Sequence, residues 1–135
     1  IMGNSMKKIT LLLVIIFTLL FSTTSWGEWE LGSESVTDGK MYYDKDRVRK
    51  NGAFLYFWML HDYGRPSLDG TLSVTIYTQL DCSIFRYKDL KVQFYDKSMG
   101  EGEIASEGTA QDEWKYLQPE SVIEFMYNKV CEEQQ

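Results

Sequence analysis

The chain has 135 residues with 14 Lys and Arg against 20 Asp and Glu, and 44% of its residues are hydrophobic and 15% aromatic. This composition can fill one small core and excludes a disordered chain, while the length leaves no room for a second domain beside an export segment. The net charge of −6 argues against nucleic acid and anionic membrane surfaces as partners, because both need a basic protein face.

The first 27 residues have the pattern of a bacterial signal peptide. Lys7 and Lys8 supply a basic start after Met6, the expected translation start, and residues 9–21 form an apolar run of 13 residues. That run is shorter than the roughly 20 residues that a membrane-spanning helix needs. We therefore expect residues 1–27 to be a cleaved signal peptide and not a retained anchor.

The cleavage site follows the small residues at the end of this segment. Ser25 and Gly27 predict a cut after Gly27, and a cut after Ser25 is the alternative. No cysteine follows the cut for lipid attachment, so we expect no stable membrane anchor. The expected product is a single domain of residues 28–135, located in the periplasm, secreted or associated with the cell surface, with a net charge of −8 because both lysines of the signal are lost.

Most of the mature chain has the patterns of β-strands. We expect strands over residues 28–35, 40–43, 53–60, 71–82, 84–95 and 103–106, with a helical turn and loop over residues 44–51. The strand 53–60 is apolar throughout, which predicts a central strand covered on both faces. The strand 71–82 alternates between apolar and polar residues, so Cys82 shares a face with the apolar set.

The last element changes to a helical period. Pro119 and Glu120 suit the first turn of a helix, and an apolar stripe follows from Val122 to Cys131. Consecutive strands followed by one helix predict an α+β fold. We expect a single antiparallel β-sheet of about five or six strands with a C-terminal α-helix packed on it.

The chain has two cysteines, Cys82 and Cys131. In an oxidising compartment, a distant pair is more often a disulfide than a metal or catalytic site. Both residues fall on predicted core faces, so a disulfide would tie the helix to the sheet. Closing a loop of this length removes unfolded-state entropy worth about 4 kcal/mol.

No group of residues predicts catalysis or metal binding. His61 stands beside Asp62, but no nucleophile-elbow pattern accompanies them, so a strand-end histidine is favoured over a hydrolytic triad. The stretch from Gly100 to Ala105 matches a dinucleotide motif in letters only, because no helical pattern follows it. Asp44 and Asp46 have calcium-loop spacing without the required glutamate. We predict a non-enzyme with no cofactor and no metal.

Tyrosines are the remaining candidates for contact with a partner. Tyr77 and Tyr95 stand opposite the core-facing register of their strands, where tyrosine is a common contact residue. Cross-strand pairing without a functional role is the alternative interpretation of these two residues.

Short motifs in a particular order resemble the bacterial surface-adhesin protein E family over nearly the whole mature chain. They are Trp29, Asp38-Gly39-x-x-Tyr42-Tyr43, Lys50-Asn51-Gly52, Trp58, Leu60-x-Asp62-Tyr63, Asp81-Cys82, Gly100-x-Gly102, Trp114-x-Tyr116-x-x-Pro119-x-Ser121 and Val130-Cys131. The resemblance implies a compact antiparallel sheet with a C-terminal helix, a bond between Cys82 and Cys131, and an exported non-enzymatic protein. The family takes its name from a member that binds host proteins.

Together these observations predict an exported binding domain of the bacterial envelope, adhesin-like in function. A small periplasmic inhibitor or chaperone-like factor is the alternative, because such proteins also use a disulfide-stapled β-domain. A protein of the envelope or the extracellular space is the expected partner. The identity of that partner and the oligomeric state do not follow from the sequence.

Overall fold

The computed structural model describes residues 7–10 and 28–135. Its elements are β1 (Trp29–Ser35), β2 (Gly39–Asp44), the 3-10 helix η1 (Lys45–Arg47), β3 (Arg49–Asn51), β4 (Phe54–Asp62), β5 (Ser73–Asp81), β6 (Arg86–Tyr95), the 3-10 helix η2 (Ser98–Gly100), β7 (Ser106–Gly108), β8 (Lys115–Tyr116) and α2 (Val122–Glu133). The predicted signal peptide and its cleavage site lie outside the described residues, apart from residues 7–10. No helix in the described part of the chain is long and apolar enough to cross a membrane.

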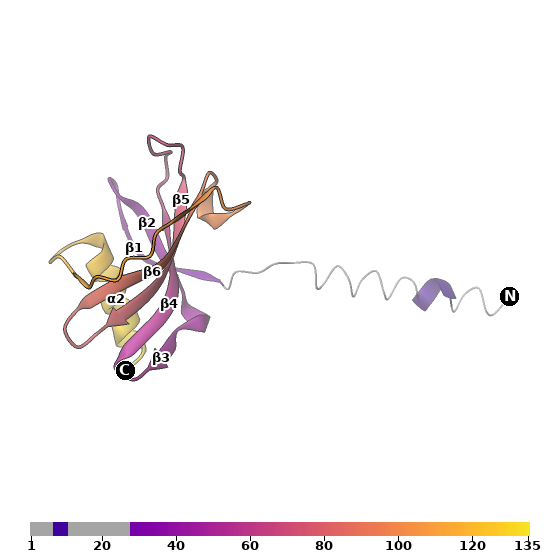
Figure 1. Ribbon diagram of the computed structural model, residues 1–135. Coiled ribbons are helices and arrows are strands. Elements are labelled where there is room, and N and C mark those ends of the chain that lie inside the picture. The colour runs from indigo at the N-terminus through magenta and orange to yellow at the C-terminus, as the bar shows by residue number, and fades with distance from the viewer. Residues whose placement is uncertain (1–6, 11–27) are drawn as a thin grey trace.

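The strands form one antiparallel sheet in the order β1-β2-β4-β5-β6-β7, with β3 beside β4 and β8 beside β6. Figure 1 shows α2, in yellow, lying against this sheet. The predicted α+β fold with a C-terminal helix is confirmed. The short strands β3 and β8 were not predicted, and the strand expected at residues 103–106 is displaced to Ser106–Gly108.

One face of the sheet, the helix face, holds the main core. Leu55, Phe57 and Met59 alternate along β4 with less buried neighbours, and Leu80 stands beside Leu55 on β5. They pack with buried residues of α2, which include Met126 and Tyr127. The predicted alternation of β5 is thus correct for its apolar set.

The helix begins later than predicted. Ser121 is its N-cap, and the Ser121 hydroxyl accepts a hydrogen bond from the backbone N–H of Glu124 at 3.2 Å. Pro119 and Glu120 therefore precede the helix, and Glu120 has a positive φ of 64° that a helix interior does not allow. The Ser-x-x-Glu pattern, in which Glu124 also accepts from the backbone N–H of Glu120, was the stronger start signal.

Two contacts hold α2 close to the sheet. The predicted disulfide between Cys82 and Cys131 is confirmed, with Cα atoms 5.9 Å apart and a sequence separation of 49. At the other end of the helix, a Cβ atom on Gly32 of β1 would lie 2.3 Å from Cγ of Met126. Glycine therefore lets β1 approach the helix where any larger residue would force a shift.

The opposite face of the sheet is covered only at one end. There η2 places Gly100 against Leu60 and Thr75, and the backbone N–H of Gly100 donates to the Ser73 hydroxyl at 2.9 Å. Toward the other end of β4, Tyr56 and Trp58 are only partly buried. The prediction that this strand is covered on both faces is therefore wrong for this half, because no element of the described residues packs over it.

Candidate binding face

The uncovered half of the sheet brings aromatic and basic side chains together. Because directly paired residues of adjacent strands share a face, pairing of Trp58 with Tyr77 and of Tyr77 with Lys91 makes one row across three strands. Pairing of Arg49 with Tyr56 adds a cation beside that row. We call this surface the open face and define it by the six residues Arg47, Arg49, Tyr56, Trp58, Tyr77 and Lys91.

Tyr77 lies at the centre of the aromatic part of the open face. Its ring centroid is 5.2 Å from that of Trp58 and 6.4 Å from that of Tyr56. The Tyr56 hydroxyl accepts a hydrogen bond from Nε2 of Gln79 at 3.1 Å. These contacts hold three partly exposed rings in place before any partner arrives, which lowers the entropy lost on binding.

Two shallow hollows meet at Tyr77. The first, of about 330 Å³, is lined by Arg47, Arg49, Trp58, Tyr77 and Lys91. The second is lined by Arg49, Asn51, Tyr56, Tyr77 and Leu90. The register between β5 and β6 shifts after Tyr77, at the point where Leu90 stands without a cross-strand partner. That irregularity directs Leu90 into the second hollow, and the two hollows share Arg49 and Tyr77.

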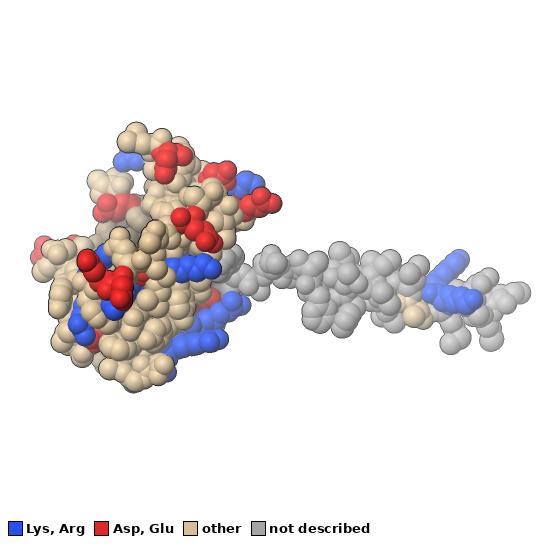
Figure 2. Space-filling model, in the orientation of Figure 1, with Lys and Arg blue, Asp and Glu red and all other residues tan. Residues whose placement is uncertain are grey.

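The cations of the open face differ in how they are paired. Arg47 approaches the carboxylate of Asp44, with Nε 3.7 Å from Oδ2. Arg49 and Lys91 are exposed and form no ion pair within the described part of the chain. Figure 2 shows Lys and Arg side chains gathered near β3, whereas Asp and Glu predominate at the opposite end of the domain.

Asp44 is the acidic residue that Arg47 of the open face approaches. It is only 1% exposed, and neither of its carboxylate oxygens has a hydrogen-bond partner among the described residues. Burial raises the pKa of Asp44 above its ordinary value, and the nearby Arg47 counteracts only part of that rise. Since this carboxylate is enclosed, it cannot reach Arg49 or Lys91 on the surface.

Of the two predicted contact tyrosines, Tyr77 lies on the open face and Tyr95 does not. Tyr95 is 2% exposed, and its hydroxyl lies 3.4 Å from the Thr75 hydroxyl and donates to Oε1 of Gln93 at 3.3 Å. Both tyrosines point away from α2, as predicted. The prediction that Tyr95 is available for contact is wrong because η2 covers its end of that face with Gly100.

His61 and Asp62 lie at the end of β4, away from the open face. The Nε2 atom of His61 hydrogen-bonds to the backbone carbonyl of Asp38, and its ring packs edge-on against Tyr63 at 4.6 Å. Asp62 accepts from the backbone N–H of Met99 at 3.4 Å. These contacts stabilise the turns at this end of the sheet. In the described residues, no group of three or more His, Cys, Asp or Glu could hold a metal ion.

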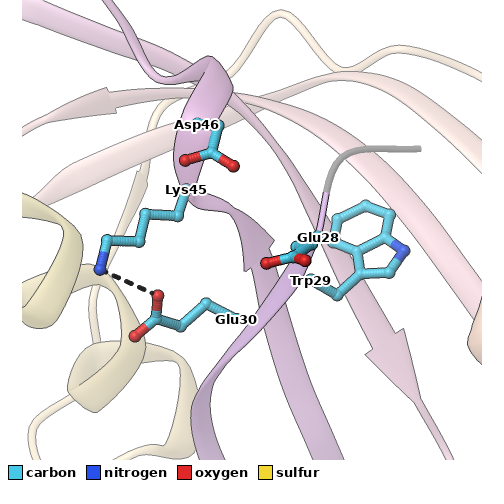
Figure 3. Close-up of a pocket in the computed structure, with 5 residues that line it drawn as sticks. All are labelled: Glu28, Trp29, Glu30, Lys45 and Asp46. Carbon is cyan, nitrogen blue, oxygen red and sulfur yellow. Dashed lines mark ion pairs between the residues drawn. The ribbon is translucent and has the colours of Figure 1, made fainter. Parts of the chain in front are cut away.

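A further hollow lies where β1 meets η1, lined by Glu28, Trp29, Glu30, Lys45 and Asp46. Figure 3 shows Lys45 and Glu30 pointing toward one another, while the Trp29 ring lies on the other side of β1. The Lys45 ammonium is 3.2 Å from Glu30, which also pairs with Lys129 at 3.3 Å. The hydrogen bond from Lys45 lowers the pKa of Glu30. The charges of Lys45 and Glu30 in this hollow are thus paired within the domain.

The sequence did not reveal the basic members of the open face. Arg47 and Arg49 stood in a segment predicted as a turn and loop, and Trp58 in a strand expected to be covered. Arg49 faces this side because it pairs with Tyr56 once β3 forms, whereas Arg47 lies in η1, where the period of a strand does not predict its position. Lys91 lies within the strand expected over residues 84–95, whose pattern does not show that it would neighbour Tyr77.

Comparisons with known proteins agree on one relationship. The family model described as surface-adhesin protein E matches residues 29–132. The structure of crystal form II of Haemophilus influenzae protein E superposes with a TM-score of 0.60 at 18% identity, covering 82% of this chain and 92% of that one. Another structure of the same protein has a TM-score of 0.59 at 17% identity, with the same coverage. No curated protein matches the chain. At these identities the structural likeness shows the fold.

Proposed function

The chain belongs to the surface-adhesin protein E family, and on that premise we propose that it is an exported, non-enzymatic binding protein that captures another protein through its open face. The observation that carries the proposal is the open face itself, where Tyr77 stands between Trp58, Arg49 and Lys91 on an uncovered sheet surface. The family description indicates a surface or extracellular location, which agrees with the expected signal peptide over residues 1–27.

The composition of the open face favours a protein partner. Trp, Tyr and Arg are the residues that most often dominate the binding energy of protein interfaces. Here they are clustered, partly desolvated and held in place by one another, while Asp and Glu predominate at the opposite end of the domain. Nothing in the comparisons supports the inhibitor or chaperone alternative.

The contacts made by the residues that could have supported catalysis also agree with a binding role. His61 is engaged with a backbone carbonyl, and the acidic residues Asp44 and Asp81 are buried beside Arg47 and Arg86, respectively. His61 lines a hollow with Thr37 and Ser67, but the Ser67 hydroxyl donates to Asp69, and within the described residues no hydrogen bond joins His61 to a hydroxyl group. The proposal therefore assigns the open face to recognition and requires no chemical step.

Capture of envelope and matrix proteins by the exported protein tests this proposal. Partners identified by crosslinking and mass spectrometry are purified, and their affinity is measured for the parent chain and for Tyr77→Ala. We expect an affinity loss of about tenfold or more, because the ring is the central contact of the face. Phe125→Ala serves as the control, since Phe125 is 59% exposed on α2.

The result must separate binding from folding. Circular dichroism and urea unfolding should show that Tyr77→Ala keeps the fold. A variant that is folded and retains every partner with parental affinity shows that the open face is not the contact surface. An equal loss in Phe125→Ala assigns the contact to the helix side.

A further inference from the structure

We infer that the open face takes an acidic polypeptide segment, in which carboxylates flank an apolar side chain. This inference rests on the proposed function and specifies the ligand class of the same site. Three features of the molecule support it: the pairing of the cations on the sheet, the charge of the rest of the chain, and the form of the hollow at Tyr77.

The basic residues on this side of the sheet divide into two groups. Arg86 is 3.0 Å from the carboxylate of Asp81 and lies over the Trp114 ring at 4.1 Å. Lys88 is 3.1 Å from Asp112 and 4.7 Å from the same ring. These two cations are satisfied within the domain and hold Trp114 in place.

The second group surrounds Tyr77. Arg49 and Lys91 stand on opposite sides of it, from β3 and β6, and neither has a carboxylate partner in the part of the chain that the structure describes. In a chain with 20 acidic residues, two exposed cations without an ion pair at the same hollow create a local positive potential. A partner with carboxylates would complement it, and arginine can bind a carboxylate through two parallel hydrogen bonds.

The aromatic residues that line the hollow indicate that the ligand has an apolar part as well as charged groups. Trp58 and Tyr77 are partly exposed and line a space of about 330 Å³ between Arg47, Arg49 and Lys91. That space suits an apolar side chain packed on the rings while neighbouring carboxylates reach the cations. Adjacent hollows joined at Tyr77 suit an extended segment more than a single small anion.

The remainder of the chain disfavours a long polyanion. Nucleic acid and heavily sulfated polysaccharides need many cations along a continuous path. Here the cations are few, and a net charge of −6 repels a polyanion that extends beyond the open face. A short acidic stretch within a partner protein meets the local cations without lying across the acidic surface.

The test measures binding of a synthetic peptide, with glutamates on both sides of one leucine, to the exported protein by calorimetry at several salt concentrations. We expect the affinity to fall as salt rises, and the matching peptide with glutamines to bind more weakly. Arg49→Gln combined with Lys91→Gln should weaken the glutamate peptide by about threefold to tenfold, the range of two partly exposed ion pairs.

Lys50→Gln is the matched control for charge. Lys50 lies between Arg49 and Asn51 on β3, is exposed, and pairs with Leu55, which places it on the helix side of the sheet. We expect this variant to bind within twofold of the parent. An equal loss in Lys50→Gln would mean that net charge alone explains the effect and would overturn the inference.

Other results overturn the inference without affecting the proposed function. If Tyr77→Ala weakens a captured partner but the double charge variant does not, the open face binds proteins and the acidic-ligand assignment is wrong. A glutamine peptide that binds as tightly as the glutamate peptide has the same consequence. A sulfated oligosaccharide that binds more tightly than the peptide, and depends on Arg49 and Lys91, would assign the site to polysaccharide.

Discussion

The two faces of the same sheet are built from the same strands but have different roles. On β4, Leu55, Phe57 and Met59 face α2 and are almost fully buried, while Tyr56 and Trp58 point the other way and remain partly exposed. The helix face is closed by a helix and a disulfide. The opposite side of the sheet is covered by η2 at one end, and the open face is the half that stays uncovered.

This difference separates stability from recognition. Residues of the helix face contact each other across long sequence distances, so their loss destabilises the whole domain. Residues of the open face contact mainly one another, so they can be exchanged at moderate cost. A binding surface on that face can change its partner without changing the fold.

The sharpest test of this comparison uses adjacent residues of β4. Phe57→Ala should lower the free energy of unfolding by about 3–5 kcal/mol, because Phe57 is 0% exposed and packs edge-on against Tyr127 with ring centroids 5.7 Å apart. Tyr56→Ala on the open face should cost about 1 kcal/mol, mainly through its ring contact with Tyr77. Urea unfolding followed by circular dichroism measures both.

If Tyr56→Ala costs as much as Phe57→Ala, the open face contributes to the core and the division between the faces is incorrect. Equal m-values for the two variants are needed for the comparison, since a change in the slope would indicate a changed unfolded state.

The next largest effect concerns the link between α2 and the sheet. Replacing both Cys82 and Cys131 by serine should lower the free energy of unfolding by about 2–5 kcal/mol, because the bond closes a long loop in the unfolded chain. Thermal unfolding of the parent and the variant measures the loss. Titration of thiols in the denatured, unreduced parent should detect none, and two reactive thiols would contradict the disulfide.

The smallest effect is a gain in stability at the border of the open face. Burial raises the pKa of Asp44 above that in the unfolded chain, so the folded state binds the proton more tightly. The contribution of Asp44 to stability therefore decreases as the pH rises from its ordinary pKa through the raised value. Asp44→Asn should raise stability at neutral pH and remove this pH dependence, as measured by urea unfolding at several pH values.

Asp81 is a control for Asp44, because its pKa is shifted in the opposite direction. Burial opposes its ionisation, but hydrogen bonds from Ser83 and Arg86 outweigh burial and lower the pKa of Asp81. Its contribution is present above the ordinary pKa and is lost as the pH falls through the lowered value. Asp81→Asn should therefore destabilise the protein at neutral pH. Unfolding curves between acidic and neutral pH that shift in the same direction for both variants would contradict this assignment.

Local patterns in the sequence predicted much of the fold. The alternation over residues 71–82 predicted which side of β5 faces the core, and the stripe from Val122 to Cys131 predicted the packed side of α2. Both predictions place Cys82 and Cys131 toward the core, so the disulfide followed from the same patterns. The helix start was wrong by three residues because Pro119 was weighted above the Ser121 cap.

The candidate site was only partly predictable. The sequence placed Tyr77 and Tyr95 on the side of the sheet away from α2, and that placement is correct. Whether such a side chain is exposed depends on what else covers it. The chain returns through η2 over Tyr95 and leaves Tyr77 uncovered, and no pattern within either strand records that path.

The sequence by itself thus determined the type of fold, the core-facing sides of β5 and α2 and the cysteine pair, because these depend on the periods of strand and helix and on a few residues nearby. Only the tertiary structure decided which half of the second face stays open. It also decided that Arg49 and Lys91, 42 positions apart, lie on either side of Tyr77. Strand pairing brings such distant residues together, and its register is set by the packing of the whole sheet.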